Sequence, residues 1–221
     1  MHGVFRRLTA GLFFVLLAAT VSRAESPLIF EEVLQGIDRY YEGLSSLKAS
    51  FTQLVEVPAL EKSERFSGTL YFLKPDYLRL EYRKPKGQLL VADGTWYWFY
   101  MPQEDVPQAM RAPMGEGVEG PRYVLGGQMS RRFSGTLVGR EPRGGADSYV
   151  LDLEPLAATT FYKTLRAWVD TETFATRAVR YLDESGNFNT FDLSDLEQNA
   201  EFSPGKFNFT PPPGTQILDE N

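Results

Sequence analysis

Residues 77–101 read YLRLEYRKPKGQLLVADGTWYWFYM, and this stretch decides the fold. Leu78, Leu80 and Tyr82 alternate with polar or charged residues, which is the period-two pattern of a strand with one buried face. The Asp-Gly pair at 93–94 is a hairpin-turn signal, and the segment 96–101 that follows it is bulky on both faces of the pleat. One face of an antiparallel sheet is normally exposed to solvent. The second face of these strands therefore needs cover from a helix, another sheet or an apolar ligand.

Strand patterns separated by turn residues dominate the chain. The expected strands are 50–57, 66–73, 77–83, 88–92, 96–101, 135–140, 148–153, 162–170, 175–182 and 188–193. Short connections join neighbouring strands, and no sequence repeat of a propeller or solenoid is present. The pattern predicts a mainly β fold with some helix, in which about ten or eleven strands form one barrel-like or strongly curved sheet.

Two segments are predicted to be helical. The first has Ser26 as its cap and Pro27 at its first position, and its apolar residues recur at helical spacing: Phe30, Val33, Leu34, Ile37, Tyr41 and Leu44. The second lies in a region at about 113–134, where a Gly-rich approach leads to Leu125, Met129 and Phe133, spaced four apart. A weak helix on a flexible approach suits a movable lid, and it suits an ordinary connector equally well.

The N-terminus predicts export. Arg6 and Arg7 precede an apolar stretch at 8–19, and Ser22 and Ala24 supply the small residues of a cleavage site. We expect residues 1–24 to be a signal peptide and residues 25–221 to form a single domain. Because the chain has no Cys, it cannot carry a lipid on a terminal cysteine. The expected location is the periplasm of a bacterium with two membranes.

The composition excludes several classes of function. The only His is His2, inside the predicted signal, so His- or Cys-based catalysis, metal sites and their cofactors are not expected. Losing the signal's three arginines takes the formal charge from −6 to −9, which argues against nucleic acid as a partner. An enzyme would have to use a carboxylate pair, either Asp152 with Glu154 or Asp192 with Asp195. Acidic residues in turns and on wet faces explain these pairs more simply, so no catalytic residue is expected.

Several short motifs then occur in a characteristic order. They are Ala-Ser-Phe-Thr-Gln at 49–53, Gly68-x-Leu70, Pro75, Arg79-x-x-Tyr82, Pro85, Leu90-Val91-x-Asp93-Gly94, Trp98-Phe99-Tyr100-x-Pro102 and Phe207-x-Phe209-x-Pro211-Pro212-x-Gly214. In this order and spacing the chain resembles the outer-membrane lipoprotein carrier family, the LolA-like periplasmic lipoprotein chaperones. The likeness covers essentially all of residues 25–221, and the last motif matches the family's terminal strand and turn.

The resemblance implies an unclosed antiparallel barrel with a helical lid over an apolar cavity that holds lipoprotein acyl chains. It implies a monomeric shuttle that a LolCDE-like inner-membrane ABC transporter loads and that delivers to a LolB-like outer-membrane acceptor. On this basis Leu78, Leu80 and Tyr82 face the cavity. Its other expected lining residues are Leu89, Val91, Trp98 and Tyr100 from the strands, and Val124, Leu125 and Met129 from the lid.

One position departs from the family pattern. The family often has Arg directly before Pro75, where it latches the lid by bonding lid backbone, and this chain has Lys74. Lysine keeps the charge but lacks the planar fork of arginine, so the closed state is expected to be held less tightly or by other contacts.

A second function also fits the sequence. A half-barrel of this kind could bind or sense another lipid, such as a glycolipid, because fold alone does not choose cargo. The motifs from Ala49 to Pro102 and the terminal motif favour the carrier.

Overall fold

The computed structural model describes residues 29–114, 127–157, 162, 164–203 and 205–219. Within these ranges, two α-helices and a short 3-10 helix accompany twelve strands. In chain order the elements are α1 (Phe30–Glu42), β1 (Ser46–Val57), η1 (Pro58–Leu60), β2 (Lys62–Leu73), β3 (Tyr77–Lys84), β4 (Leu89–Ala92), β5 (Trp96–Met101), β6 (Gln108–Pro113), α3 (Met129–Arg132), β7 (Phe133–Arg143), β8 (Ala146–Pro155), β9 (Thr164–Asp170), β10 (Thr176–Leu182), β11 (Phe188–Gln198) and β12 (Gln216–Asp219).

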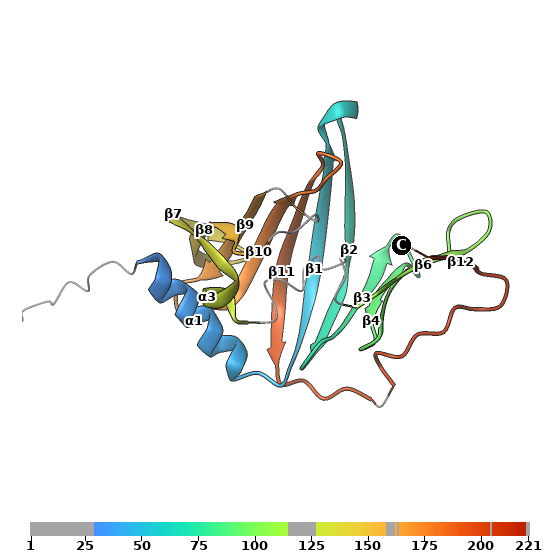
Figure 1. The fold of residues 1–221 in the computed structure, drawn as a ribbon, viewed down its shortest axis with the longest axis horizontal. Coiled ribbons are helices and arrows are strands. Elements are labelled where there is room, and N and C mark those ends of the chain that lie inside the picture. The colour runs from blue at the N-terminus through green and yellow to red at the C-terminus, as the bar shows by residue number, and fades with distance from the viewer. Residues whose placement is uncertain (1–28, 115–126, 158–161, 163, 204, 220–221) are drawn as a thin grey trace, which may run out of the picture.

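All twelve strands belong to one sheet, in the order β12-β6-β5-β4-β3-β2-β1-β11-β10-β9-β8-β7. Neighbouring strands pair antiparallel, except for β12 and β6, which are parallel. The two end strands, β7 and β12, do not pair with each other in the described part of the chain. The prediction of a mainly β fold with a single unclosed sheet is thus confirmed (Figure 1).

All ten predicted strands are present, but several begin or end at other residues than predicted. β1 already begins at Ser46, and β11 continues to Gln198. Two further strands, β6 and β12, were not predicted, because β6 ends in a proline without clean alternation and β12 is only four exposed residues. The Phe207-x-Phe209 motif, which the resemblance places in the terminal strand, lies outside any strand, and β12 follows it.

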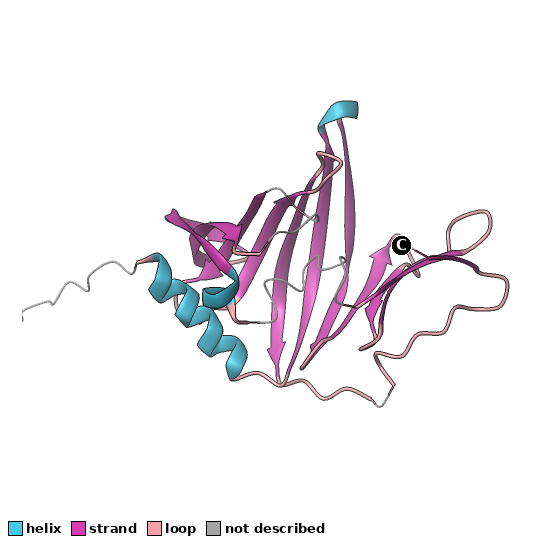
Figure 2. Ribbon diagram, viewed as in Figure 1, coloured by secondary structure: helices cyan, strands magenta, loops and turns pink. Residues whose placement is uncertain are grey.

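Helix α1 covers one face of the sheet, which we call the inner face. It begins later than predicted: Ile29, not Ser26, is its N-cap, and the Ile29 N–H donates to the Glu32 carboxylate at 2.9 Å. Its apolar stripe is buried against the inner face and forms one core with Phe51, Leu70 and Leu80. In Figure 2, α1 and α3 lie side by side on this face, and the two helices are in contact.

A glycine in the middle of α1 fixes how closely the helix approaches the β9–β10 turn. A Cβ on Gly36 would lie 2.2 Å from a ring carbon of Phe174, so no larger residue fits there. Glycine lowers helix stability by roughly 0.5–1 kcal/mol relative to alanine. In return, the absence of a side chain at Gly36 lets the Phe174 ring of the β9–β10 turn pack directly against α1.

On the opposite face, which we call the outer face, part of the C-terminal segment 199–219 packs against β2, β3 and β5. In Figure 1 this segment, drawn in red, runs from the end of β11 to the far edge of the sheet. The Phe207 ring lies 5.7 Å from Tyr77, and the Phe209 ring lies 5.6 Å from Trp98. Lys206 donates to Glu81 at 2.9 Å. The apolar second face of the strands at 96–101 thus has its cover from the chain itself.

Parts of two predicted regions fall outside the described residues. The predicted signal peptide, residues 1–24, is one of them. Of the predicted lid at 113–134, residues 115–126 are not described, and the helix in the remainder is limited to α3, Met129–Arg132.

Candidate apolar ligand site

The strand register assigns the residues of β3 to β6 to the two faces. Leu78 and Leu80 pair with Ala92 and Leu90, so these four side chains share the inner face. The same rows continue across the sheet as Leu90–Phe99–Met110 and Ala92–Tyr97–Ala112. An apolar surface therefore extends from the core under α1 out to β6.

This surface opens at its far end. An apolar hollow of about 200 Å³ lies over β4–β6, lined by Leu90, Tyr97, Trp98, Phe99, Met110, Arg111 and Ala112. Leu90, Phe99 and Met110 are only partly buried, so their side chains are accessible to a ligand. Ligand pockets typically measure roughly 300–1,000 Å³. The hollow as described is smaller, and a lipid with more than one chain needs it to widen.

The residues predicted to line a cavity lie on both faces. Leu78, Leu80 and Tyr82 belong to the inner core with α1, and so does Met129 of α3, which is 1% exposed. A separate cluster on the outer face, against Phe209, contains Leu89, Val91, Trp98 and Tyr100. The structure does not bring these four together with Leu78 and Leu80. Val124 and Leu125 lie outside the described residues.

The reason for the split is the register between β3 and β4. The sequence correctly groups Val91 with Trp98 and Leu89 with Tyr100, since these residues are paired. Leu80, however, pairs with Leu90 and not with Leu89 or Val91. A shift of one residue moves a whole strand's side chains to the other face. The inner-face residues that the sequence reasoning missed are therefore Leu90, Tyr97, Phe99 and Met110.

A carboxylate on α1 holds α3 in place. The backbone N–H groups of Met129 and Ser130 donate to Asp38 at 2.5 and 3.1 Å, and the Ser130 hydroxyl donates at 2.5 Å. These bonds satisfy donors at the start of α3 that have no partner within the helix. Asp38 is separated from α3 by about ninety residues, and no local pattern in the sequence marks it.

We expect Asp38→Ala to loosen α3 while leaving the sheet intact. The substitution removes all three hydrogen bonds, and bonds to a charged group contribute about 1.5–3 kcal/mol each. Hydrogen exchange at the amides of Met129 and Ser130 should become at least about tenfold faster. Glu31→Ala, which removes an exposed acid from the same helix, is the control. Equal hydrogen-exchange protection of α3 in Asp38→Ala and Glu31→Ala would contradict the role of Asp38 in holding α3.

Lys74 bonds the end of α1. Its ammonium group donates to the backbone carbonyl of Glu42 at 3.0 Å, where the last turn of the helix leaves its carbonyls unpaired. Lys74 is predicted to hold the backbone of the lid at 113–134, of which residues 115–126 lie outside the described residues. Lys74 thus lies beside the helix that covers the inner face.

A short chain of polar side chains crosses the inner face beyond Leu80. The Tyr82 hydroxyl donates to Gln53 Oε1 at 3.2 Å, and Gln53 Nε2 donates to Asn189 Oδ1 at 3.2 Å. Asn189 Nδ2 then donates to Asp183 Oδ2 at 3.1 Å. Burial raises the pKa of Tyr82, so its phenol stays protonated. We call these four residues the polar chain. The sequence reasoning did not identify it.

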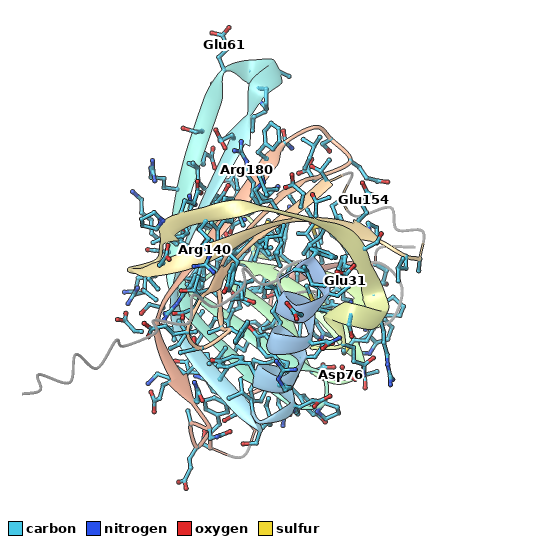
Figure 3. The ribbon with its side chains drawn as sticks, turned by 90° about the vertical axis from the view of Figure 1, so that its left-hand side faces the viewer. Glu31, Glu61, Asp76, Arg140, Glu154 and Arg180 are labelled. Atoms are coloured by element: carbon cyan, nitrogen blue, oxygen red, sulfur yellow. The ribbon has the colours of Figure 1, made fainter. Side chains whose placement is uncertain are left out.

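The carboxylates that an enzyme would need are engaged elsewhere. Asp152 accepts two bonds from Arg166 at 2.6 and 2.8 Å, and Asp192 accepts two from Arg143 at 2.5 and 3.1 Å. By the strand register, both pairs lie on the outer face with the Arg180–Glu56 pair. Arg180 is among the side chains labelled in Figure 3. In the described ranges, no group of three or more His, Cys, Asp or Glu could hold a metal ion. No helix there is long and apolar enough to span a membrane.

Comparison with known proteins shows which family this chain resembles in sequence. A family model described as the outer membrane lipoprotein carrier protein LolA matches residues 42–210, more than half of the chain. The outer-membrane lipoprotein carrier protein of Alkalilimnicola ehrlichii is 29% identical over 213 residues, covering 94% of each chain. That of Neisseria meningitidis serogroup B is 28% identical, covering 93% of this chain and 95% of its own.

A solved structure supports the fold. An uncharacterized conserved protein from Thermus thermophilus superposes with a TM-score of 0.55 at 13% identity, covering 86% of this chain and 98% of its own. At this identity the likeness concerns the fold alone.

Proposed function

Because the chain belongs to the outer-membrane lipoprotein carrier family LolA, we propose that it binds lipoprotein acyl chains on its inner face and carries them through the periplasm from the inner to the outer membrane. Proteins of this family are carriers and not enzymes. The expectation of a binding protein without catalytic residues agrees with this membership.

The observation that supports the proposal best is the continuous apolar inner face. It begins in the core under α1, where Leu78 and Leu80 are fully buried, and it ends in the partly open hollow at Phe99 and Met110. An acyl chain placed in the hollow would extend this apolar surface and remove part of its hydrocarbon from water. Each buried methylene contributes roughly 0.8 kcal/mol, so a long chain is strongly favoured over water.

Binding of a whole lipid requires the helices to move. The core beneath α1 is buried, with Leu34 at 2% and Leu80 at 0% exposure, so an acyl chain that enters between α1 and the sheet has to displace the helix. We propose that α1 and α3 move away from the inner face. The hydrogen bonds between Asp38 and α3, and the one from Lys74 to the end of α1, would set the free energy of this movement. Over-stabilising the closed state would lower affinity, because only the open fraction of molecules can bind.

The energetics also imply partners. A bilayer is as apolar as the inner face, so transfer of acyl chains from membrane to carrier is close to neutral. Loading then needs an energised donor, for which we propose a LolCDE-like ABC transporter in the inner membrane. Unloading needs an acceptor with higher affinity, for which we propose a LolB-like protein at the outer membrane.

A release assay tests this function. The exported protein, purified from the periplasm, is added to energised spheroplasts, and the soluble fraction is probed for lipoproteins. We expect lipoproteins to appear only when both ATP and the carrier are present. If a bona fide carrier releases them and this protein does not, the lipoprotein proposal fails, and another lipid such as a glycolipid becomes the candidate cargo.

A further inference from the structure

The polar chain lies where an amphiphile bound on the inner face would place its polar end. Tyr82 is two residues beyond Leu80, which pairs with Leu90 in the hollow. The Tyr82 ring packs edge-on against Phe51 at 5.1 Å and against Phe66 at 6.2 Å. Aromatic residues thus border the polar chain on its core side. Apolar surface on one side and polar groups on the other match a lipid's acyl chains and their linkage.

Donor groups remain available along the polar chain. An amide nitrogen carries two N–H groups. Within the described residues, Gln53 Nε2 and Asn189 Nδ2 each donate one hydrogen bond, so each keeps one N–H for a ligand. Gln53 is partly buried and Asn189 is 7% exposed. The second N–H of Asn189 is shielded from water, so an incoming carbonyl oxygen would stabilise it, and the second N–H of Gln53 is accessible to the same ligand.

The charge of the polar chain limits which lipid it can accept. Three of its members are neutral, and the fourth, Asp183, is a carboxylate that accepts from Asn189 and from the Asn187 N–H at 2.8 Å. In a lipoprotein, ester carbonyls join acyl chains to the glyceryl group on the N-terminal cysteine, and an amide carbonyl joins the chain on its amino group. Both carbonyls are neutral acceptors that suit the spare N–H groups. A phospholipid phosphate would face the Asp183 carboxylate without a cation in the chain to balance it.

We propose that the polar chain Tyr82–Gln53–Asn189–Asp183 binds the neutral ester and amide linkages of acylated cargo. Phospholipids carry the same esters, so the selection of lipoproteins over anionic phospholipids comes from the Asp183 carboxylate, which disfavours a phosphate group. This inference rests on the proposed function, since it assigns a second part of the same site. It adds a selection step: acyl chains alone cannot distinguish a lipoprotein from the phospholipids that surround it in a membrane.

The test compares two ligands that differ only in their carbonyls. One is a diacylglyceryl lipopeptide with ester-linked chains, and the other is its dialkyl ether analogue. We expect the wild-type protein to bind the ester form about five- to thirtyfold more tightly, the range for one or two hydrogen bonds. Gln53→Leu and Asn189→Leu keep the side-chain volume but remove the donors, so each should bring this ratio towards one. Thr52→Val, on the outward-facing neighbour, is the matched control and should keep the wild-type ratio.

The ratio is taken within each variant, so a partly unfolded preparation does not distort it. A second measurement uses phosphatidylglycerol: Asp183→Asn should bind it more tightly than the wild type does. An unchanged ester-to-ether ratio in both leucine variants would overturn the polar chain as the site that binds the linkages. Unchanged phosphatidylglycerol binding in Asp183→Asn would overturn the selection against phospholipids, and both results leave the carrier function standing. Failure of the wild-type protein to bind either lipopeptide would overturn both the role of the polar chain and the carrier function.

Discussion

Replacing Phe99 by Asp is expected to lower acyl-chain binding by at least about 100-fold, whereas replacing the adjacent Tyr100 by Asp should leave it nearly unchanged. Phe99 lines the hollow on the inner face, and Tyr100 packs against Phe209 on the outer face. A carboxylate at 99 would have to be buried under hydrocarbon without a partner, at a penalty of several kcal/mol.

Both residues are partly buried, so both variants should fold, and circular dichroism with thermal melting checks this. Binding is measured with a fluorescent long-chain lipid. Because the two positions are neighbours in sequence, the pair separates the faces with little change in composition. Equal loss of binding in both variants, or loss only in Tyr100→Asp, would contradict the inner face as the site.

The second large effect concerns stability. Asp170→Asn is expected to destabilise the protein by about 3 kcal/mol, since breaking a buried ion pair leaves the other charge unpaired. Asp170 is 4% exposed and accepts from Arg177 at 2.6 and 3.0 Å, and it also accepts the Glu172 and Thr173 N–H groups at 2.9 Å. These bonds shape the turn that presses Phe174 onto Gly36. Loss of the pair should therefore loosen α1 as well.

Urea unfolding measures the change, with Asp152→Asn as the matched control. Asp152 pairs with Arg166 in similar geometry, but both side chains are more than 40% exposed. Exposed pairs contribute about 0–1 kcal/mol, so this variant should be close to the wild type. If the two substitutions destabilise the protein equally, Asp170 does not have the role assigned to it.

The same residue predicts a pH dependence. Burial alone would raise the pKa of Asp170, but hydrogen bonds from the Thr173 N–H, Arg177 and the Glu172 N–H hold it below its usual value. A lowered pKa in the folded state stabilises the protein above the unfolded pKa of about 3.9 and loses that effect as the pH falls further. The stability difference between wild type and Asp170→Asn should therefore shrink below about pH 4.

Local sequence patterns predicted most of the sheet, because alternation and turn residues act over a few positions. They also placed the apolar residues of α1, from Phe30 to Tyr41. These patterns could not predict the register, that is, which residues of neighbouring strands pair with each other. The choice between Leu89 and Leu90 for the inner face depends on which of them pairs with Leu80, and that register is set by the whole sheet.

The remaining parts of the site are tertiary. Asp38 meets α3, and Gln53 meets Asn189, across long separations in sequence. Each residue taken alone resembles a surface polar residue, and neither has a spacing that indicates its partner. The packing of Phe209 on the outer face was equally out of reach. Trp98 and Tyr100, which the sequence predicts to line a cavity, pack against this ring.

Site-specific photo-crosslinking tests the central claim most directly. A photoreactive phenylalanine analogue is placed at position 99, 110, 91 or 100 in separate carriers, which are loaded with lipoprotein in spheroplasts and irradiated. Positions 99 and 110 lie on the inner face, and positions 91 and 100 lie on the outer face. Crosslinks to the acylated part of the lipoprotein from 99 and 110 alone are the predicted result. Crosslinks from 91 or 100, with none from 99 and 110 in carriers that still release lipoprotein, would contradict it.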